Sequence, residues 1–283
     1  MNPSQFCPIS KLDRLLLATD RSTFSEGAVR EAINFAKRCS SWLYVMSVME
    51  SNPEYETIGA NVFEKEEKEA LAYLEAIKTR AVHEGVSCYT ILREGATPHQ
   101  LITGEAVERK ADMIVIGRRG RSGLMKVLMG NVAAKVIGHA PCKVLVVPRA
   151  ARIECRNILV ATDGSAHSMA AAAEAIGIAK RSGGNIIAVS TMYVQEGFEE
   201  AKANVGAVVE MARKEGIPVE ALTPAGRSHE VIVETAGGRG VDLIVMGAYG
   251  KTGLKKILMG SSTEKVIGHA NCAVLVVRAS CPL

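Results

Sequence analysis

The sequence predicts two α/β domains in tandem, each built on a five-stranded parallel sheet. Residues 117–147 and 247–277 agree at 19 of 31 positions without a gap, and residues 15–25 resemble residues 158–168. The chain is therefore a tandem duplication. In each copy, short apolar runs alternate with helical patterns of apolar residues, which is typical of parallel strands covered on both faces.

The apolar runs mark the expected strands, and the stretches between them carry the expected helices. Residues 28–36 form a helical stripe of apolar side chains, and residues 171–179 repeat it. Each copy therefore has the order β-α-β-α-β-α-β-α-β. The strands are expected to begin near Arg14, Trp42, Ser87, Met113 and Lys143 in the first copy, and near Asn157, Asn185, Val219, Leu243 and Cys272 in the second.

The duplication also sets the expected domain boundaries, which are residues 1–150 and 151–283. Corresponding residues are 143 apart at the start of the copies but 130 apart in the later block, so the first copy carries 13 extra residues. They fall between Glu50 and Leu71, where the sequence is polar, and we expect a surface insertion ahead of the second helix. Each half is long enough to fold without a metal or a disulfide.

The composition is that of an ordinary α/β protein, with 48% hydrophobic and 23% charged residues. The first residues lack a basic leader followed by an apolar core, so we expect no signal peptide. An unbroken apolar stretch of membrane-spanning length is absent as well. The seven cysteines include no C-x-x-C pair. We expect them to be reduced thiols in a cytoplasmic protein, with Cys142 and Cys272 as equivalent core residues.

The net charge of +4 is too small to suggest a polyanion-binding tail, so the sequence predicts no clear nucleic-acid site. Acidic residues are nevertheless absent from residues 113–153 and 243–263. A solvated basic face and a site for an anion both fit this local bias. The basic residues in these stretches include Arg118, Arg119, Arg121, Lys126, Lys251, Lys255 and Lys256.

A glycine pattern occurs in both acid-free stretches, between an apolar run and a helical pattern. An isolated glycine usually marks a turn or a helix cap, but three glycines at a repeated spacing favour a loop that holds phosphate. Asp20 and Asp163 follow the first strand of each copy, so they would face these loops if the first and fourth strands are neighbours. The glycines are Gly117, Gly120 and Gly130 in the first copy and Gly247, Gly250 and Gly260 in the second.

These residues resemble the ATP-binding branch of the universal stress proteins, which carries G-x2-G-x9-G-[ST] after the fourth strand and an Asp after the first. The second copy matches in full with Ser261, whereas the first departs at Asn131. The resemblance covers essentially the whole chain. It implies a Rossmann-like sheet of order 3-2-1-4-5 and a bound adenine nucleotide (ATP, ADP or AMP), with Mg²⁺ on the phosphates. It also places adenine near Val48 or Thr191.

The residues of this motif have separate expected roles. The glycines allow the main chain to approach the ligand, Ser261 lies at or beside a helix N-cap, and Asp163 accepts hydrogen bonds from ribose. In the first copy Asn131 can cap the helix, but Arg21 replaces the equivalent Gly164 and puts a long side chain beside Asp20. We therefore expect weaker or altered binding in the first half.

Other catalytic and metal-binding patterns are missing from the sequence. A Walker A motif, a G-x-G-x-x-G motif, a catalytic triad and zinc-type spacing are all absent, so we assign no catalytic or metal-ligating residue. Four histidines at equivalent positions are assigned structural roles. A slow ATPase, a nucleotidyl-transfer enzyme and a nucleotide-independent interaction scaffold remain as alternatives. These histidines are His99, His139, His229 and His269.

The last strand of each copy predicts how the two halves associate. Residues 143–147 and 272–277 are apolar apart from Lys143 and would lie at the edge of a sheet of order 3-2-1-4-5, and such edges tend to pair. We expect them to pair in antiparallel fashion and to join the halves as a pseudo-twofold pair. Homodimerisation is also expected to be possible.

Overall fold

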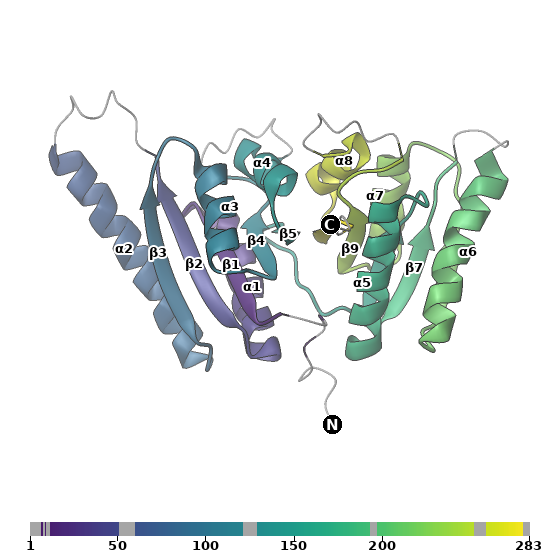
Figure 1. Cartoon of the computed structure of the whole chain (residues 1–283), viewed down its shortest axis with the longest axis horizontal. Coiled ribbons are helices and arrows are strands. Elements are labelled where there is room, and N and C mark those ends of the chain that lie inside the picture. Colours follow the sequence, from purple (N-terminus) through teal and green to yellow (C-terminus); the bar gives the residue numbers. More distant parts are fainter. Residues whose placement is uncertain are drawn as a thin grey trace.

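The ten strands formed by the described residues join in a single sheet. The structure is a computed structural model that describes residues 7, 9, 12–50, 60–120, 129–192, 197–251 and 259–279, without the side chains of 60 and 61. The strand order is β3-β2-β1-β4-β5-β10-β9-β6-β7-β8. Figure 1 shows the two halves side by side, with helices on both faces of the sheet. Each half therefore has the predicted order 3-2-1-4-5.

The elements of the two halves follow the same sequence along the chain. The first half comprises β1 (Arg14–Ala18), the 3-10 helix η2 (Thr23–Ser25), α1 (Glu26–Cys39), β2 (Trp42–Met49), α2 (Ala60–His83), β3 (Cys88–Glu94), α3 (Pro98–Glu108), β4 (Met113–Gly117), α4 (Asn131–His139) and β5 (Lys143–Val147). The second comprises β6 (Asn157–Ala161), α5 (Ala166–Ser182), β7 (Asn185–Val189), α6 (Phe198–Lys214), β8 (Val219–Leu222), α7 (Ser228–Gly238), β9 (Leu243–Gly247), α8 (Ser261–His269) and β10 (Ala273–Val277).

Two apolar layers lie on opposite faces of the sheet. Helices α1, α2, α5 and α6 bury residues in one layer, and α3, α4, α7 and α8 bury residues in the other. The central strands carry buried side chains at nearly every position, as in the patterns of β4 and β9. This double coverage explains why the sequence shows continuous apolar runs rather than alternation.

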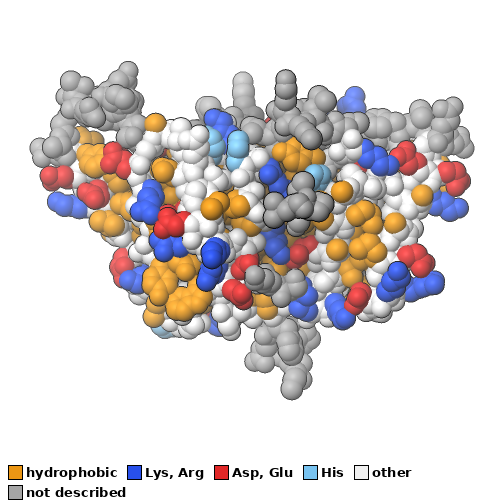
Figure 2. Space-filling view, in the orientation of Figure 1, with side chains coloured by type: hydrophobic (Ala, Val, Ile, Leu, Met, Phe, Trp, Pro, Cys, Tyr) orange, Lys and Arg blue, Asp and Glu red, His pale blue; other side chains and the backbone are white. Residues whose placement is uncertain are grey.

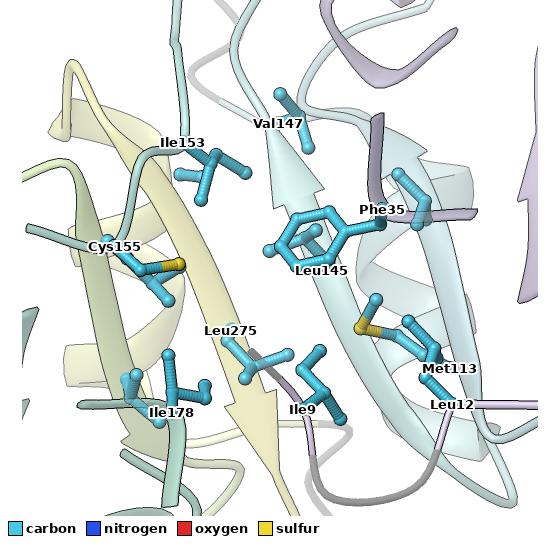
Figure 3. Packing of buried hydrophobic residues seen from close by; sticks show 14 of the residues in the cluster. Ile9, Leu12, Phe35, Met113, Leu145, Val147, Ile153, Cys155, Ile178 and Leu275 are labelled. Atoms are coloured by element: carbon cyan, nitrogen blue, oxygen red, sulfur yellow. The ribbon is translucent and has the colours of Figure 1, made fainter. Parts of the chain in front are cut away.

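The two halves meet through their last strands, as predicted. β5 and β10 are antiparallel, and Leu145 lies opposite Leu275. On one face of this seam, both leucines belong to an apolar cluster that also includes Ile9 from the segment before β1 and Ile153 from the linker between the halves (Figure 3). The seam is thus a continuous sheet and a shared core, which encloses two edges that would otherwise be exposed.

The extra residues of the first half lie partly inside regular elements. α2 has 24 residues against 17 in α6. The prediction of a surface insertion is therefore only partly right, because a longer helix takes up much of the added length. Residues 51–59 lie outside the described residues.

The prediction that all cysteines are reduced is wrong for one pair. Cys7 and Cys39 form a disulfide, although 32 positions separate them in the sequence. The fold brings the segment before β1 against the end of α1. The spacing of the cysteines in the sequence does not predict this contact. Cys142 and Cys272 are reduced, and burial raises the pKa of the Cys142 thiol to about 12 and that of Cys272 to about 11.

None of the helices formed by the described residues combines the length and the apolar character needed to span a bilayer. Figure 2 shows Lys and Arg side chains lying among Asp and Glu on one broad face of the molecule. This mixing is in keeping with the small net charge of the chain.

Candidate functional site

A cavity of about 930 Å³ lies at the carboxyl end of the sheet in the first half. Strands β1 and β4 are parallel neighbours, so the loops that follow them open toward the same edge of the sheet. All six residues predicted for this half line the cavity. They are Asp20, Val48, Gly117, Gly120, Gly130 and Asn131.

The two carboxylate oxygens of Asp20 differ in their contacts with the described residues. Its Oδ1 accepts hydrogen bonds from the backbone N–H of Ser22 at 3.1 Å and from the Ser22 hydroxyl at 2.8 Å. Its Oδ2 is buried and has no hydrogen bond to the part of the chain that the structure describes. A Cβ at Gly120 would lie 3.1 Å from this oxygen, so the glycine allows the loop to approach the carboxylate closely.

The start of α4 supplies backbone donors to the same cavity. Gly130 is the N-cap, with φ −68° and ψ 140°, and no side chain caps the helix. Asn131 is the first helical residue, so the expectation that it caps α4 is not met. The first backbone N–H groups of a helix have no partner within it, and the helix dipole favours an anion there. This end of α4 is therefore suited to hold a phosphate.

Sequence reasoning missed how three further residues contribute to the cavity. Arg21 has φ 67° and donates from Nη2 to Glu66 of α2 at 2.7 Å. Its Nε and Nη1, and Nε of Arg119, are buried without a hydrogen-bond partner among the described residues. The sequence indicated Arg119 only as one of several basic residues in the stretch that lacks Asp and Glu. No sequence pattern pointed to Glu66, because it lies in the region of the insertion, where the second copy offers no equivalent residue for comparison.

Arg118 does not contribute to the first site as expected. Its Nη1 crosses the seam and donates to the carbonyl of Ala270, the C-cap of α8, at 2.6 Å. A cation at the C-terminal end of a helix is favoured by the helix dipole. Burial and neighbouring Arg119 lower the pKa of Arg118. Arg118 therefore belongs to the contact between the halves, while Arg121 lies outside the described residues.

In the second half, Asp163 is already engaged on both oxygens. Its Oδ1 accepts from the backbone N–H of Ser165 at 3.0 Å, and its Oδ2 accepts from that of Lys251 at 2.8 Å. Burial raises the pKa of this carboxyl, but hydrogen bonds from Ser165, Lys251 and Ser168 outweigh it, so the pKa is lowered overall. The Lys251 ammonium also pairs with Glu200 of α6.

The described ends of the glycine loop in the second half meet at the start of α8. Gly260 is the N-cap of α8, and Ser261 is the first helical residue, beside the cap. The backbone N–H of Gly260 donates to Ala248 at 2.9 Å, and the Thr263 hydroxyl donates to the carbonyl of Gly247 at 3.0 Å. These bonds hold the start of the loop against the start of the helix.

Two predicted residues of the second half differ in how closely they join this loop. A Cβ at Gly250 would lie 2.5 Å from Asp163 Oδ2, so the loop and the aspartate are in close contact. Thr191 follows β7 at the same edge of the sheet, and its hydroxyl lies 2.7 Å from that of Ser228. The structure gives no contact between Thr191 and the glycine loop within its described residues.

The comparisons with known proteins identify the family. The sequence matches the model of the Universal stress protein family over residues 11–148 and again over residues 154–278. The chain belongs to the universal stress protein family. Universal stress protein MJ0531 of Methanocaldococcus jannaschii is 37% identical over 144 residues, covering 48% of this chain and 82% of that protein. Universal stress protein Sll1388 of Synechocystis is 31% identical over 149 residues, covering 47% and 96%.

The tandem arrangement also has a counterpart among solved structures. The crystal structure of a universal stress protein from Archaeoglobus fulgidus superimposes with a TM-score of 0.78, covering 95% of this chain and all of that one. The sequences are 22% identical, so this likeness concerns the fold. In this universal stress protein, the described residues form no group of three or more His, Cys, Asp or Glu side chains that could hold a metal ion.

Proposed function

We propose that this universal stress protein binds an adenine nucleotide, ATP or the related ADP or AMP, at the carboxyl edge of the sheet. One observation carries the proposal. The first half combines Asp20, the glycine loop and the start of α4 around a single cavity of about 930 Å³. This volume lies in the range of small-molecule binding sites. The match to the glycine motif of the ATP-binding branch supports the choice of ligand.

Each part of the nucleotide has a suitable group in the first half. The phosphates would lie at the start of α4, beside Gly130 and Asn131, where backbone N–H groups favour an anion. The buried N–H groups of Arg21 and Arg119 would add charged donors. Asp20 Oδ2 would accept a hydrogen bond from a ribose hydroxyl, and adenine would lie near Val48.

Mg²⁺ would enter with the phosphates and would be held mainly by them. This ion commonly keeps several waters and uses only one or two carboxylates of the protein. Asp20 and Glu66 both line the first cavity and offer carboxylate oxygens. The ion would neutralise phosphate charge beside these carboxylates.

The two sites would differ in affinity, with the first the tighter. The sequence alone favours the second site, because its motif is complete. The described geometry supports the opposite order. Asp163 already uses both oxygens, and Lys251 lies over Gly164, with its Cε 3.5 Å from where a Cβ would be. A nucleotide would have to displace hydrogen bonds there, whereas no described residue donates a hydrogen bond to Asp20 Oδ2.

A matched pair of variants tests the proposal in the full chain. Gly130→Asp and Gly260→Asp each place a carboxylate at the N-cap before a phosphate-binding helix, where it would repel phosphate. Isothermal titration with Mg-ATP should show the tighter event lost in Gly130→Asp and kept in Gly260→Asp. The double variant should not bind. Binding by the double variant equal to that of the wild type would refute the site.

Two further readouts address the alternatives. Release of ADP or AMP from the titrated samples would indicate catalysis in addition to binding. Circular dichroism of each variant checks that the fold is retained, so that lost binding is not mistaken for unfolding. Absence of any heat or thermal shift with ATP in the wild type would instead favour an interaction scaffold. Cytoplasmic location and homodimerisation remain predictions.

A further inference from the structure

The disulfide between Cys7 and Cys39 fastens the segment before β1 to the end of α1. Cys39 is the last residue of α1, and the bond closes a loop with a sequence separation of 32. This loop contains β1, η2 and α1. The segment that precedes β1 is therefore held on one side by the sheet and on the other by the disulfide.

That segment is part of the core between the two halves. Ile9 and Leu12 are each only 3% exposed and belong to the apolar cluster shared by both halves. Figure 3 shows Ile9 pointing toward Leu275 of β10, with Leu12 beside Met113 of β4. The hydroxyl of Ser41 also donates a hydrogen bond to the carbonyl of Leu12. Displacing the segment would thus open one side of the seam.

The second half closes the same side of the seam without a disulfide. Ile153 and Cys155, in the linker before β6, are 6% and 0% exposed and belong to the same cluster. Here the chain itself fastens the segment, because β5 precedes it and β6 follows it. The corresponding segments of both halves are thus covalently tethered, by a disulfide in the first half and by the continuous main chain in the second, and the disulfide can be opened by reduction.

The paired cysteines are also more accessible than two of the other thiols. Cys7 and Cys39 are half-buried, whereas Cys88 and Cys155 are buried. Burial raises the pKa of Cys88 to about 11 and that of Cys155 to about 12. A thiol reacts with oxidants as its thiolate, so these two are poor targets at neutral pH.

We propose that Cys7 and Cys39 form a reversible thiol–disulfide site that fastens the segment before β1 into the seam when oxidised. The oxidant class is a peroxide. One thiolate attacks a peroxide oxygen and becomes a sulfenic acid, and the second thiolate attacks that sulfur and releases water. For hydrogen peroxide, two thiols become one disulfide and two waters form. A dithiol reverses the reaction and is itself oxidised.

Reduction would weaken the fastening without breaking the sheet. Ile9 would then be held by packing alone, and the segment would leave the seam more often because the unfastened chain gains conformational freedom.

Thiol counting tests the chemistry. The full chain is reduced, desalted and treated briefly with equimolar hydrogen peroxide, then denatured and alkylated with N-ethylmaleimide for intact mass measurement. The treated wild type should take up two fewer labels than the reduced wild type. Cys88→Ser is the matched control and should keep this difference, whereas Cys7→Ser and Cys39→Ser should lose it. An unchanged label count in the treated wild type, or the same difference in Cys7→Ser, would overturn the proposal.

Hydrogen exchange tests the structural consequence. Backbone amides in the peptide that covers residues 7–13 should exchange roughly tenfold faster or more in the reduced wild type than in the oxidised form. Cys39→Ser should match the reduced protein with or without reductant. Because the comparison can be made on the wild type alone, a variant that fails to fold does not weaken the test. Equal exchange in the two redox forms would rule out the fastening role.

Discussion

We expect the same glycine-to-alanine substitution to affect stability differently in the two glycine loops. Gly120 and Gly250 are equivalent positions, and neither has a positive φ, so alanine introduces no backbone strain at either. The difference lies in what the new Cβ would meet. In Gly250→Ala it would lie 2.5 Å from Asp163 Oδ2, whereas in Gly120→Ala it would lie 3.1 Å from Asp20 Oδ2.

The expected cost follows from the hydrogen bonds of each carboxylate. Asp163 Oδ2 accepts from the Lys251 backbone N–H at 2.8 Å, and it must turn away to admit the Cβ. Losing a hydrogen bond to a charged group costs about 1.5–3 kcal/mol. Asp20 Oδ2 has no hydrogen bond to any described residue and needs to move only slightly. We expect Gly120→Ala to cost about 0.5 kcal/mol or less.

Differential scanning calorimetry of the full chain without nucleotide measures the difference. With about 2–4 °C per kcal/mol for chains of this size, Gly250→Ala should lower Tm by about 3–12 °C and Gly120→Ala by about 2 °C or less. Each variant serves as the control for the other. Equal losses of Tm, or a larger loss in Gly120→Ala, would refute the reasoning from these contacts.

Three further predictions concern the seam, the pH response and thiol reactivity. Lysine at both Val144 and Val146, which are 2% and 1% exposed, should destabilise the seam by about 3–5 kcal/mol per buried charge, measured as loss of Tm. Val62→Lys, at a side chain 53% exposed, is the control, and an equal loss there would contradict the assignment. The lowered pKa of Asp163 gives a stability contribution that is complete above about pH 4 and lost as pH falls through that pKa. Urea unfolding from pH 5 to pH 2 should therefore show a shallower loss in Asp163→Asn, and identical pH profiles would count against these hydrogen bonds. Cys155, whose pKa burial raises to about 12, should resist alkylation in the native protein at pH 8, and rapid labelling would show that its site opens.

The sequence predicted the strands closely because burial on both faces leaves a strong local signal. Eight of the ten strands begin at the predicted residue, and the strands expected near Ser87 and Cys272 begin one residue later. The prediction that the last strands pair combined the apolar run after Lys143 in β5 with the strand order that the family resemblance implied. Helix length was less well predicted, because the polar start of α2 resembles a loop in composition.

The sequence predicted only those residues of the candidate site that occur at equivalent positions in both copies. The glycines and Asp20 could be found because both copies carry them at fixed positions. Where the main chain comes too close to another group to leave room for a Cβ, the residue must be glycine, and this can be seen in the sequence. The buried guanidinium groups of Arg21 and Arg119 could not be placed in this way. A long side chain has several rotamers, and its direction depends on neighbours such as Glu66 that are distant in the sequence.

The sequence by itself determined the duplication, the strand positions and the glycine loops, because each rests on residues close together in the chain. Only the tertiary structure decided which groups at the two sites are already engaged, where Arg118 points and which cysteines meet. These features depend on contacts between segments that are far apart in the sequence. Their geometry is set when the two halves pack against one another and against the segment before β1.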